Sequence, residues 1–292
     1  MTGIDFVALR ATRAERPYLI AEAFAKRTRR PLTQGDGRLM IIAADHPARG
    51  ALGAGKHLSA MANREELLER LVRALARPGV DGVLATPDVM DDLALLGALE
   101  NKVLVGSMNR GGLAGSVFEM DDRFGSYDIP GIVRSGIDFA KTLTRVNLSD
   151  PGTANTLQAT AHAVNEAAQA QVPIMLEPFL TEAHGAGFRN ILSAEASILS
   201  MSIAAGLGNS SAYTWLKIPV VADMARVMAS TTLPTLLLGG DHKGNLQELI
   251  DSWAPALGLP GVRGLVVGRS LLYPAGAELE EGIDSAVKLV HG

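Results

Sequence analysis

Eight short apolar runs recur along the chain, mostly separated by helix-like segments, and this alternation limits the possible folds more than any other feature. The runs are RLMIIAAD (38–45), VDGVLAT (80–86), KVLVGS (102–107), GIDFAKTLT (136–144), VPIMLEP (172–178), YTWLKIPV (213–220), LPTLLLGG (233–240) and VRGLVVG (262–268). Most of them lack polar alternation, which is typical of strands buried on both faces of a parallel sheet.

The segments between these runs carry helix signals. Asn63 and Glu66 have the spacing of a capping box, ahead of apolar residues at helical spacing. Asp150 and Pro151 combine a helix cap with a first-turn proline. Further helices are expected over 88–99, 194–206, 221–230, 245–256 and 275–290.

Eight strands with helices between them predict a (β/α)8 barrel. An open, doubly wound sheet is the alternative, because strand number alone does not show closure. A barrel fits the 292 residues as one domain. We expect a helical extension over residues 1–37 across the N-terminal face of the barrel, a barrel core over 38–272 and a C-terminal helix over 273–292. The glycine-rich, charged stretch 107–135 replaces a simple third helix and is long enough for a lid.

Composition excludes several classes of function. The chain is 47% hydrophobic and 20% charged with a net charge of -4, which gives no electrostatic reason to expect nucleic acid or an anionic membrane as partner. It has no cysteine, so disulfides, thiolate metal ligands and a cysteine nucleophile are excluded. No apolar run approaches the ~18 residues of a membrane span, and no signal region precedes the first strand. We therefore expect a cytoplasmic protein.

Polar residues interrupt or end the apolar runs, and active-site groups of a barrel lie at the carboxyl ends of its strands. Any one of these residues alone could belong to an ordinary buried ion pair. Together they converge on one rim, which indicates a site. The candidates are Asp45 and His46 in the first run and just after it, Lys141 in the fourth, Glu177 in the fifth, Lys217 in the sixth, Gly239, Gly240 and Asp241 after the seventh, and Gly268 and Arg269 after the eighth.

Lys217 has two interpretations. It pairs with Glu177 as a structural salt bridge, or it is an amine whose pKa is depressed by burial and by the neighbouring Lys141, so that it attacks a carbonyl. In the second case an imine takes up electrons when a carbon–carbon bond breaks. Glu177 and Asp45 then transfer protons.

The last two strands predict a phosphate site. Gly239 and Gly240 precede one helix, Gly268 and Arg269 precede another, and barrels commonly bind phosphate at these positions. Arg269 adds a bidentate donor. The expected ligand is a small phosphorylated carbonyl compound.

A metal site is the main chemical alternative. His46, His184 and His242 are placed near the rim and could bind a divalent ion together with a carboxylate. No His-x-His or His-x-x-x-His pair occurs, however, and a metal leaves both strand lysines unexplained. We therefore expect neither a metal nor another cofactor.

At these residues the chain resembles the class I, Schiff-base aldolases of the deoxyribose-phosphate and tagatose-bisphosphate aldolase superfamily. Over roughly residues 38–272 the resemblance is carried by AADHP, DFAKTL, MLEPF, WLKIP, LLLGGD and VVGRSLL. It is greatest to an actinobacterial aldolase-like branch associated with inositol catabolism. The resemblance implies a homo-oligomer and cleavage of a phosphorylated keto-sugar or keto-acid, such as 5-dehydro-2-deoxy-phosphogluconate, to dihydroxyacetone phosphate and an aldehyde.

The family's roles carry over residue by residue. The imine-forming lysine matches Lys217, and the other catalytic positions match Lys141, Glu177 and Asp45. The phosphate contacts match Gly239, Gly240, Gly268 and Arg269. Deoxyribose-phosphate aldolases have a second lysine in the seventh strand, where this chain reads TLLLGG, so the resemblance favours the tagatose-bisphosphate lineage.

Arg110 opens the long loop in SMNRGG, beside glycines that permit a hinge. If the substrate carries a carboxylate opposite its phosphate, Arg110 is the nearest cation by topology, with Arg123 and Arg145 behind it. The alternative is that Arg110 pairs with Glu119 or Asp121. Two other functions stay open at this point, namely a metal-dependent lyase or isomerase and a non-catalytic protein that binds phosphosugars.

Overall fold

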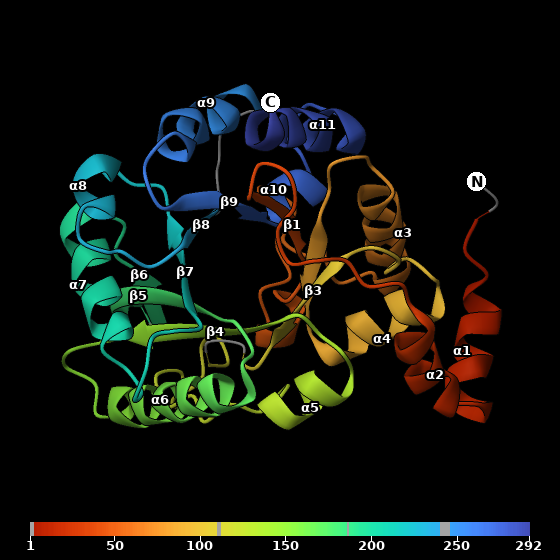
Figure 1. Ribbon diagram of the computed structural model, residues 1–292, viewed down its shortest axis with the longest axis horizontal. Helices are drawn as coiled ribbons and strands as arrows, with labels where there is room; N and C mark the ends of the chain where they lie inside the picture. Colours follow the sequence, from red (N-terminus) through yellow and green to blue (C-terminus); the bar gives the residue numbers. More distant parts are fainter. Residues whose placement is uncertain (1–2, 110–111, 186, 240–245) are drawn as a thin grey trace.

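Eight parallel strands close into a barrel in the computed structural model, which describes residues 3–109, 112–185, 187–239 and 246–292. Strand β1 pairs with both β2 and β9, and β4 pairs with β5, so the sheet has no open edge (Figure 1). This closure excludes the doubly wound alternative. The barrel strands are β1 (Leu39–Ala43), β2 (Gly82–Ala85), β3 (Val103–Ser107), β4 (Phe139–Val146), β5 (Ile174–His184), β7 (Thr214–Pro219), β8 (Thr235–Leu238) and β9 (Val262–Val267).

Helices surround the barrel, and most lie where the sequence predicts them (Figure 1). Asn63 caps α3 by accepting hydrogen bonds from the backbone nitrogens of Glu65 and Glu66. The helices are α1 (Phe6–Glu15), α2 (Tyr18–Lys26), α3 (Arg64–Leu75), α4 (Pro87–Leu95), α5 (Ile129–Arg134), α6 (Gly152–Ala170), α7 (Ala194–Ala205), α8 (Met224–Met228), α9 (Leu246–Leu257), α10 (Arg269–Leu272) and α11 (Leu279–His291), with a 3-10 turn η1 (Pro47–Arg49).

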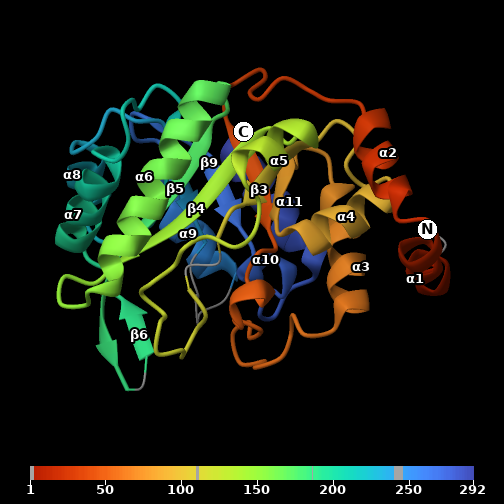
Figure 2. The ribbon, with the colours of Figure 1, turned by 90° about the horizontal axis from the view of Figure 1, so that it is seen from below.

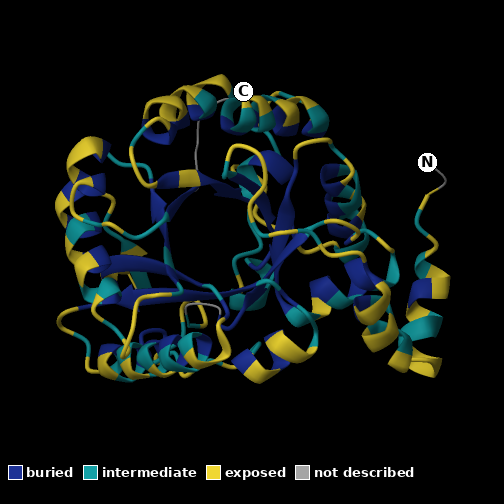
Figure 3. Cartoon of the chain, in the orientation of Figure 1, coloured by how far each residue is buried: buried dark blue, intermediate teal, exposed yellow. Residues whose placement is uncertain are grey.

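The strands are buried on both faces (Figure 3). Residues on their outer faces pack against the helices in one large apolar core. A second cluster fills the inside of the barrel, with contributions from seven of its strands: Leu39, Ile41, Ala43, Leu84, Val103, Val105, Phe139, Met175, Leu236 and Val266. Within it the rings of Phe139 and Trp215 meet edge to face, with centroids 5.3 Å apart. The interior is therefore closed below the carboxyl ends of the strands.

The N-terminal extension is helical, but it does not cover the N-terminal face as expected. Helices α1 and α2 lie outside the barrel, where α2 packs against α4 (Figures 1 and 2). Only the non-helical segment 27–38 passes over the N-terminal end, and its Leu32 packs against the inner cluster. The sequence predicted the helices and not their place, because their amphipathic pattern does not specify which helix they pack on.

Two connections differ from the sequence expectation. Strand β5 continues to His184 and forms an antiparallel hairpin with β6 (Gly187–Asn190), which projects from the end of the barrel opposite the 27–38 segment (Figure 2). The described residues 112–128 form a long loop, as predicted, but the third helix is shortened to α5 rather than replaced. Among the described residues, no helix is long and apolar enough to cross a membrane.

Candidate active site

A cavity of about 380 Å³ opens at the carboxyl ends of the strands. Its described lining carries four basic side chains, those of Arg49, Lys141, Lys217 and Arg269, against the two carboxylates of Asp45 and Glu177. The volume is in the range of small-molecule sites. The excess of basic groups suits an anionic ligand.

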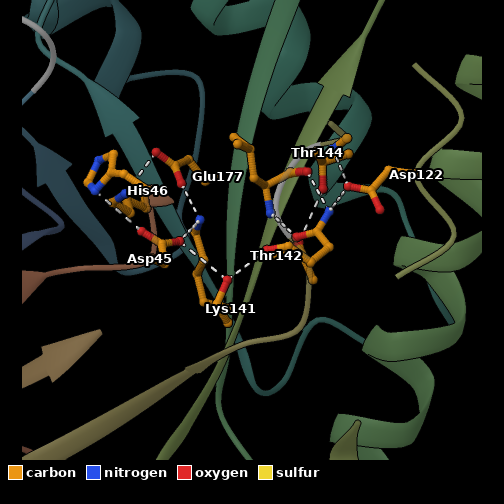
Figure 4. A network of polar contacts seen from close by, with 12 residues as sticks. Asp45, His46, Asp122, Lys141, Thr142, Thr144 and Glu177 are labelled. Carbon is orange, nitrogen blue, oxygen red and sulfur yellow. Dashed lines mark hydrogen bonds and ion pairs between the residues drawn. The ribbon is translucent and has the colours of Figure 1, made fainter. Parts of the chain in front are cut away.

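The two lysines predicted from the sequence meet at one carboxylate. Lys217 Nζ donates to Glu177 Oε1 over 2.7 Å, and Lys141 Nζ lies 2.7 Å from Glu177 Oε2. Lys141 Nζ also donates to Asp45 Oδ2 over 2.9 Å (Figure 4). All four side chains are buried, and Lys217 is only 4% exposed. The structure thus brings together the four predicted catalytic residues.

The two-residue period of a strand explains how these groups reach the interior. Lys141 follows Phe139 by two positions on β4, and Lys217 follows Trp215 by two positions on β7. Each lysine therefore faces inward directly above one of the two aromatic rings in edge-to-face contact. Glu177 stands on β5, the strand between β4 and β7. The aromatic pair therefore forms the layer of the barrel interior directly beneath the charged side chains.

The surroundings of the two lysines shift their pKa values in opposite directions. Burial lowers the pKa of Lys217, and the Lys141 ammonium lowers it further, while Glu177 and Asp45 oppose the shift without reversing it. Burial acts on Lys141 in the same way, but there the carboxylates of Asp45 and Glu177 prevail and raise the pKa. Lys217 is therefore the more readily deprotonated amine, and Lys141 stays an ammonium group.

Both carboxylates stay ionised. Burial alone would raise their pKa values, but Lys141, together with Lys217, holds the pKa of Glu177 and of Asp45 below the ordinary range. Burial lowers the pKa of His46 to about 3, aided by the neighbouring Arg269 and Lys217, so this imidazole is neutral near pH 7. His46 Nδ1 is buried without a hydrogen-bond partner, 3.8 Å from Asp45 Oδ1.

The predicted phosphate residues are partly described. Gly239, Gly268 and Arg269 line the cavity, whereas Gly240 lies outside the described residues. A side chain at Gly268 would collide with the carbonyl oxygen of Ala43, so glycine is needed there for β9 to end close to β1. Arg269 Nη1 donates to the Gly53 carbonyl oxygen over 3.4 Å. These residues bound the side of the cavity formed by β8 and β9.

Arg110, the cation predicted to bind a substrate carboxylate, lies outside the described residues. Arg123 is exposed and pairs with Asp121 over 2.9 Å, away from the cavity lining. Arg145 forms a buried ion pair with Glu119, and its other nitrogens donate to Asn190 Oδ1 and the Phe188 carbonyl oxygen. The reserve candidates Arg123 and Arg145 are thus both engaged elsewhere.

Sequence reasoning missed several polar residues of this rim. Ser107 and Asn109 continue the inward alternation of Val103 and Val105 on β3, a signal that the sequence did contain. Ser107 Oγ lies 3.3 Å from Asp45 Oδ2, and the Asn109 side chain bonds to both backbone groups of Leu143 on β4. Arg49, on η1, had no such periodic signal.

Two of the three histidines considered as metal ligands are among the described residues, and they lie in different surroundings. His46 lines the cavity, His184 is exposed in the β5–β6 hairpin, and His242 lies outside the described residues. Within the described ranges, no three His, Cys, Asp or Glu side chains are grouped so that they could hold a metal ion.

Fold and site together define a (β/α)8-barrel protein with a buried lysine–glutamate–lysine centre. The chain belongs to the Cgl0159-like family, whose model matches residues 37–287. It is similar to Cgl0159 from Corynebacterium glutamicum, with 60% identity over 98% of this chain and 96% of that one and a TM-score of 0.95. No curated protein sequence matches it.

Solved aldolases share the fold at low sequence identity. A Schiff-base-forming fructose-1,6-bisphosphate aldolase aligns with a TM-score of 0.62 and 17% identity, over 93% of this chain and 100% of that one. An archaeal fructose-1,6-bisphosphate aldolase, with its catalytic lysine covalently bound to a carbinolamine intermediate, aligns with a TM-score of 0.64 and 18% identity, over 94% and 100%. The barrel predicted from the sequence is thereby confirmed.

Proposed function

We propose that this protein is a class I aldolase in which Lys217 forms an imine with a phosphorylated ketose or keto-acid. The observation that carries the proposal is the contrast between the two buried lysines on Glu177. Burial and a neighbouring ammonium lower the pKa of Lys217, while paired carboxylates raise the pKa of Lys141. Binding alone requires no such contrast, whereas a nucleophilic amine does.

Imine formation uses the groups around Lys217. The unprotonated Lys217 nitrogen adds to the carbonyl carbon, Glu177 accepts the proton that this nitrogen then loses, and the oxygen takes a proton from solvent, which gives a neutral carbinolamine. Loss of the hydroxyl group as water, with the proton that Glu177 accepted, leaves the protonated imine. Glu177 lies within hydrogen-bond distance of both nitrogens, so it is placed to relay these protons.

Cleavage then uses the imine to take up electrons. A carboxylate removes the proton of the hydroxyl group β to the imine carbon, the adjacent carbon–carbon bond breaks, and its electron pair moves into the imine to form an enamine. The aldehyde leaves, the enamine carbon takes back a proton, and water releases dihydroxyacetone phosphate and regenerates Lys217. Glu177 and Asp45 are the carboxylates at this centre.

We assign the phosphate of the substrate to the side of the cavity bounded by Gly239, Gly268 and Arg269. Glycines let backbone N–H groups approach the ligand, and a guanidinium donates to phosphate oxygens. The substrate class is a phosphorylated keto-sugar or keto-acid, and 5-dehydro-2-deoxy-phosphogluconate is one member of it. The chemistry described for the Schiff-base-forming fructose-1,6-bisphosphate aldolases supports the same type of reaction on this barrel.

Reductive trapping tests the proposal. Wild-type protein incubated with dihydroxyacetone phosphate and borohydride should become covalently modified, since an imine is reduced to a stable secondary amine. The modification should be unaffected by a chelator. Absence of an adduct, together with turnover that a chelator abolishes, would favour a metal-dependent lyase or isomerase instead.

A further inference from the structure

The cavity contains an arginine that the reaction outlined above does not use. Arg49 stands on η1, directly after β1, and lines the same cavity as the lysines. Its Nε is buried and has no hydrogen-bond partner, and within the described residues its side chain takes part in no ion pair. Buried charges in proteins are normally paired, so this guanidinium has the properties of a group that awaits an anion.

The neighbouring charges do not supply that anion. Glu119 is paired with Arg145, while Asp45 and Glu177 are held by the lysines. Burial lowers the pKa of Arg49, and the like charge of Arg145 lowers it further. A ligand anion would remove this penalty.

Asn190 adds a second donor on the same side of the cavity. Its Oδ1 accepts a hydrogen bond from Arg145 Nε over 3.2 Å. Because that nitrogen can only donate, the orientation of the amide is fixed, and Asn190 Nδ2 remains as a donor. Asn190 lies at the end of β6 and lines the cavity with Arg49. The hairpin absent from the sequence prediction thus supplies part of the rim.

This group of donors is distinct from the expected phosphate site. Arg145 and Glu119 are among the charged groups that shift the pKa of Arg49, and Arg145 also bonds to Asn190. Asn190 ends β6, which pairs with β5, whereas Arg269 starts α10 after β9, which pairs with β1 and β8. Asn190 and Arg269 therefore stand on strands that are not neighbours in the barrel, and Arg49 shares its surroundings with Asn190.

We propose that Arg49 and Asn190 form a second anion subsite, which binds a carboxylate or phosphate group on the aldehyde half of the substrate. The inference rests on the proposed aldolase function, because it requires one substrate whose two ends are bound by Arg269 and by Arg49. It narrows the substrate class to compounds with an anionic group at each end. The role that the sequence gave to Arg110 passes to Arg49.

Acceptor selectivity in the condensation direction tests this subsite. Dihydroxyacetone phosphate is combined with glyceraldehyde 3-phosphate or glyceraldehyde, and with succinic semialdehyde or butanal, so each pair differs in one anionic group. The wild type should favour the charged member of at least one pair, and which pair identifies phosphate or carboxylate. Arg49→Met should lower the charged-to-neutral ratio of kcat/KM about 10- to 100-fold.

Two matched variants complete the test. Arg123→Met removes an exposed arginine outside the cavity and should leave the ratio unchanged, while Asn190→Ala should lower it less than Arg49→Met. A wild type without preference for either charged acceptor, or an unchanged ratio in Arg49→Met, would overturn the subsite while leaving a trapped imine intact.

A binding measurement keeps the inference testable without turnover. In calorimetry, Arg49→Met should weaken the binding of 3-phosphoglycerate, which has two anionic groups, at least tenfold. It should leave the affinity for glycerol 3-phosphate unchanged. Equal effects on both ligands, or none on 3-phosphoglycerate, would contradict it. Absence of any borohydride adduct in the wild type would instead count against the aldolase function.

Discussion

Lys141 and Lys217 contact opposite oxygens of the same carboxylate, each at 2.7 Å from Glu177. They differ in what else surrounds them. Lys141 has a second carboxylate, Asp45, at 2.9 Å, whereas Lys217 has the Lys141 ammonium as a neighbour. Glu177 therefore contacts both an amine suited to attack, Lys217, and a permanent cation, Lys141, which lowers the pKa of that amine.

Replacing Lys141 and replacing Glu177 should shift the pKa of Lys217 in opposite directions. The Lys141 ammonium lowers the pKa of Lys217, so Lys141→Met should raise that pKa and move the acidic limb of imine trapping to higher pH. The Glu177 carboxylate raises the pKa of Lys217, so Glu177→Gln should move the limb to lower pH. The measurement is the rate of borohydride-dependent modification against pH. Shifts of the same sign in both variants would refute this electrostatic account.

Glu177→Gln should also separate imine formation from the later proton transfers of the reaction. Loss of a general acid–base group typically costs ~10²–10⁴ in rate, so turnover should fall by this factor. Imine trapping should persist, because the amine of Lys217 remains. Steady-state kinetics and mass spectrometry of the same sample check both. An unchanged kcat would assign Glu177 to structure alone.

The stability effects of the two lysines should differ in size. Lys141→Met leaves Asp45 without its buried ion-pair partner and Glu177 with only Lys217, and breaking a buried pair in this way costs about 3–5 kcal/mol. Lys217→Met leaves Glu177 paired with Lys141 and removes an ammonium group whose burial lowers its pKa, so its cost should be smaller. Urea unfolding of both variants measures the difference. A larger loss in Lys217→Met would contradict the assignment of charges.

Arg269→Ala should weaken binding of phosphorylated substrate. Loss of a charged hydrogen bond costs about 1.5–3 kcal/mol, which corresponds to roughly a 10- to 100-fold rise in KM. The phosphate is bound in ground and transition states alike, so kcat should change little. Arg263→Ala, an exposed arginine on β9, is the control. Equal KM values for phosphorylated and unphosphorylated substrate in the wild type would remove the phosphate site altogether.

The sequence predicts well which charged side chains enter the barrel, because strand geometry is local. A lysine inside WLKIP and another inside DFAKTL face the interior in any barrel that keeps their apolar neighbours inside, and Lys217 and Lys141 do so. Their convergence on Glu177 follows from the order β4, β5 and β7 around the ring. The inward direction of these side chains therefore follows from the sequence, whereas closure of the sheet and the strand order come from the structure.

Other parts depend on contacts between distant segments. The β5–β6 hairpin and the position of α1 and α2 beside α4 depend on tertiary packing that no local pattern encodes. Arg49 follows a proline in a short turn, and only the structure shows that its buried Nε has no hydrogen-bond partner among the described residues. Arg145 appeared available in sequence, but Glu119, which is distant from it in the chain, neutralises it.

The position of the trapped adduct shows which of the two lysines forms the imine. Wild-type protein, Lys217→Ala and Lys141→Met are each treated with dihydroxyacetone phosphate and borohydride, digested, and the modified peptide is identified by mass spectrometry. We expect one reduced adduct on Lys217 in the wild type, and also in Lys141→Met above its raised acidic limb, with none in a folded Lys217→Ala. An adduct on Lys141, or an undiminished adduct in Lys217→Ala, would contradict it.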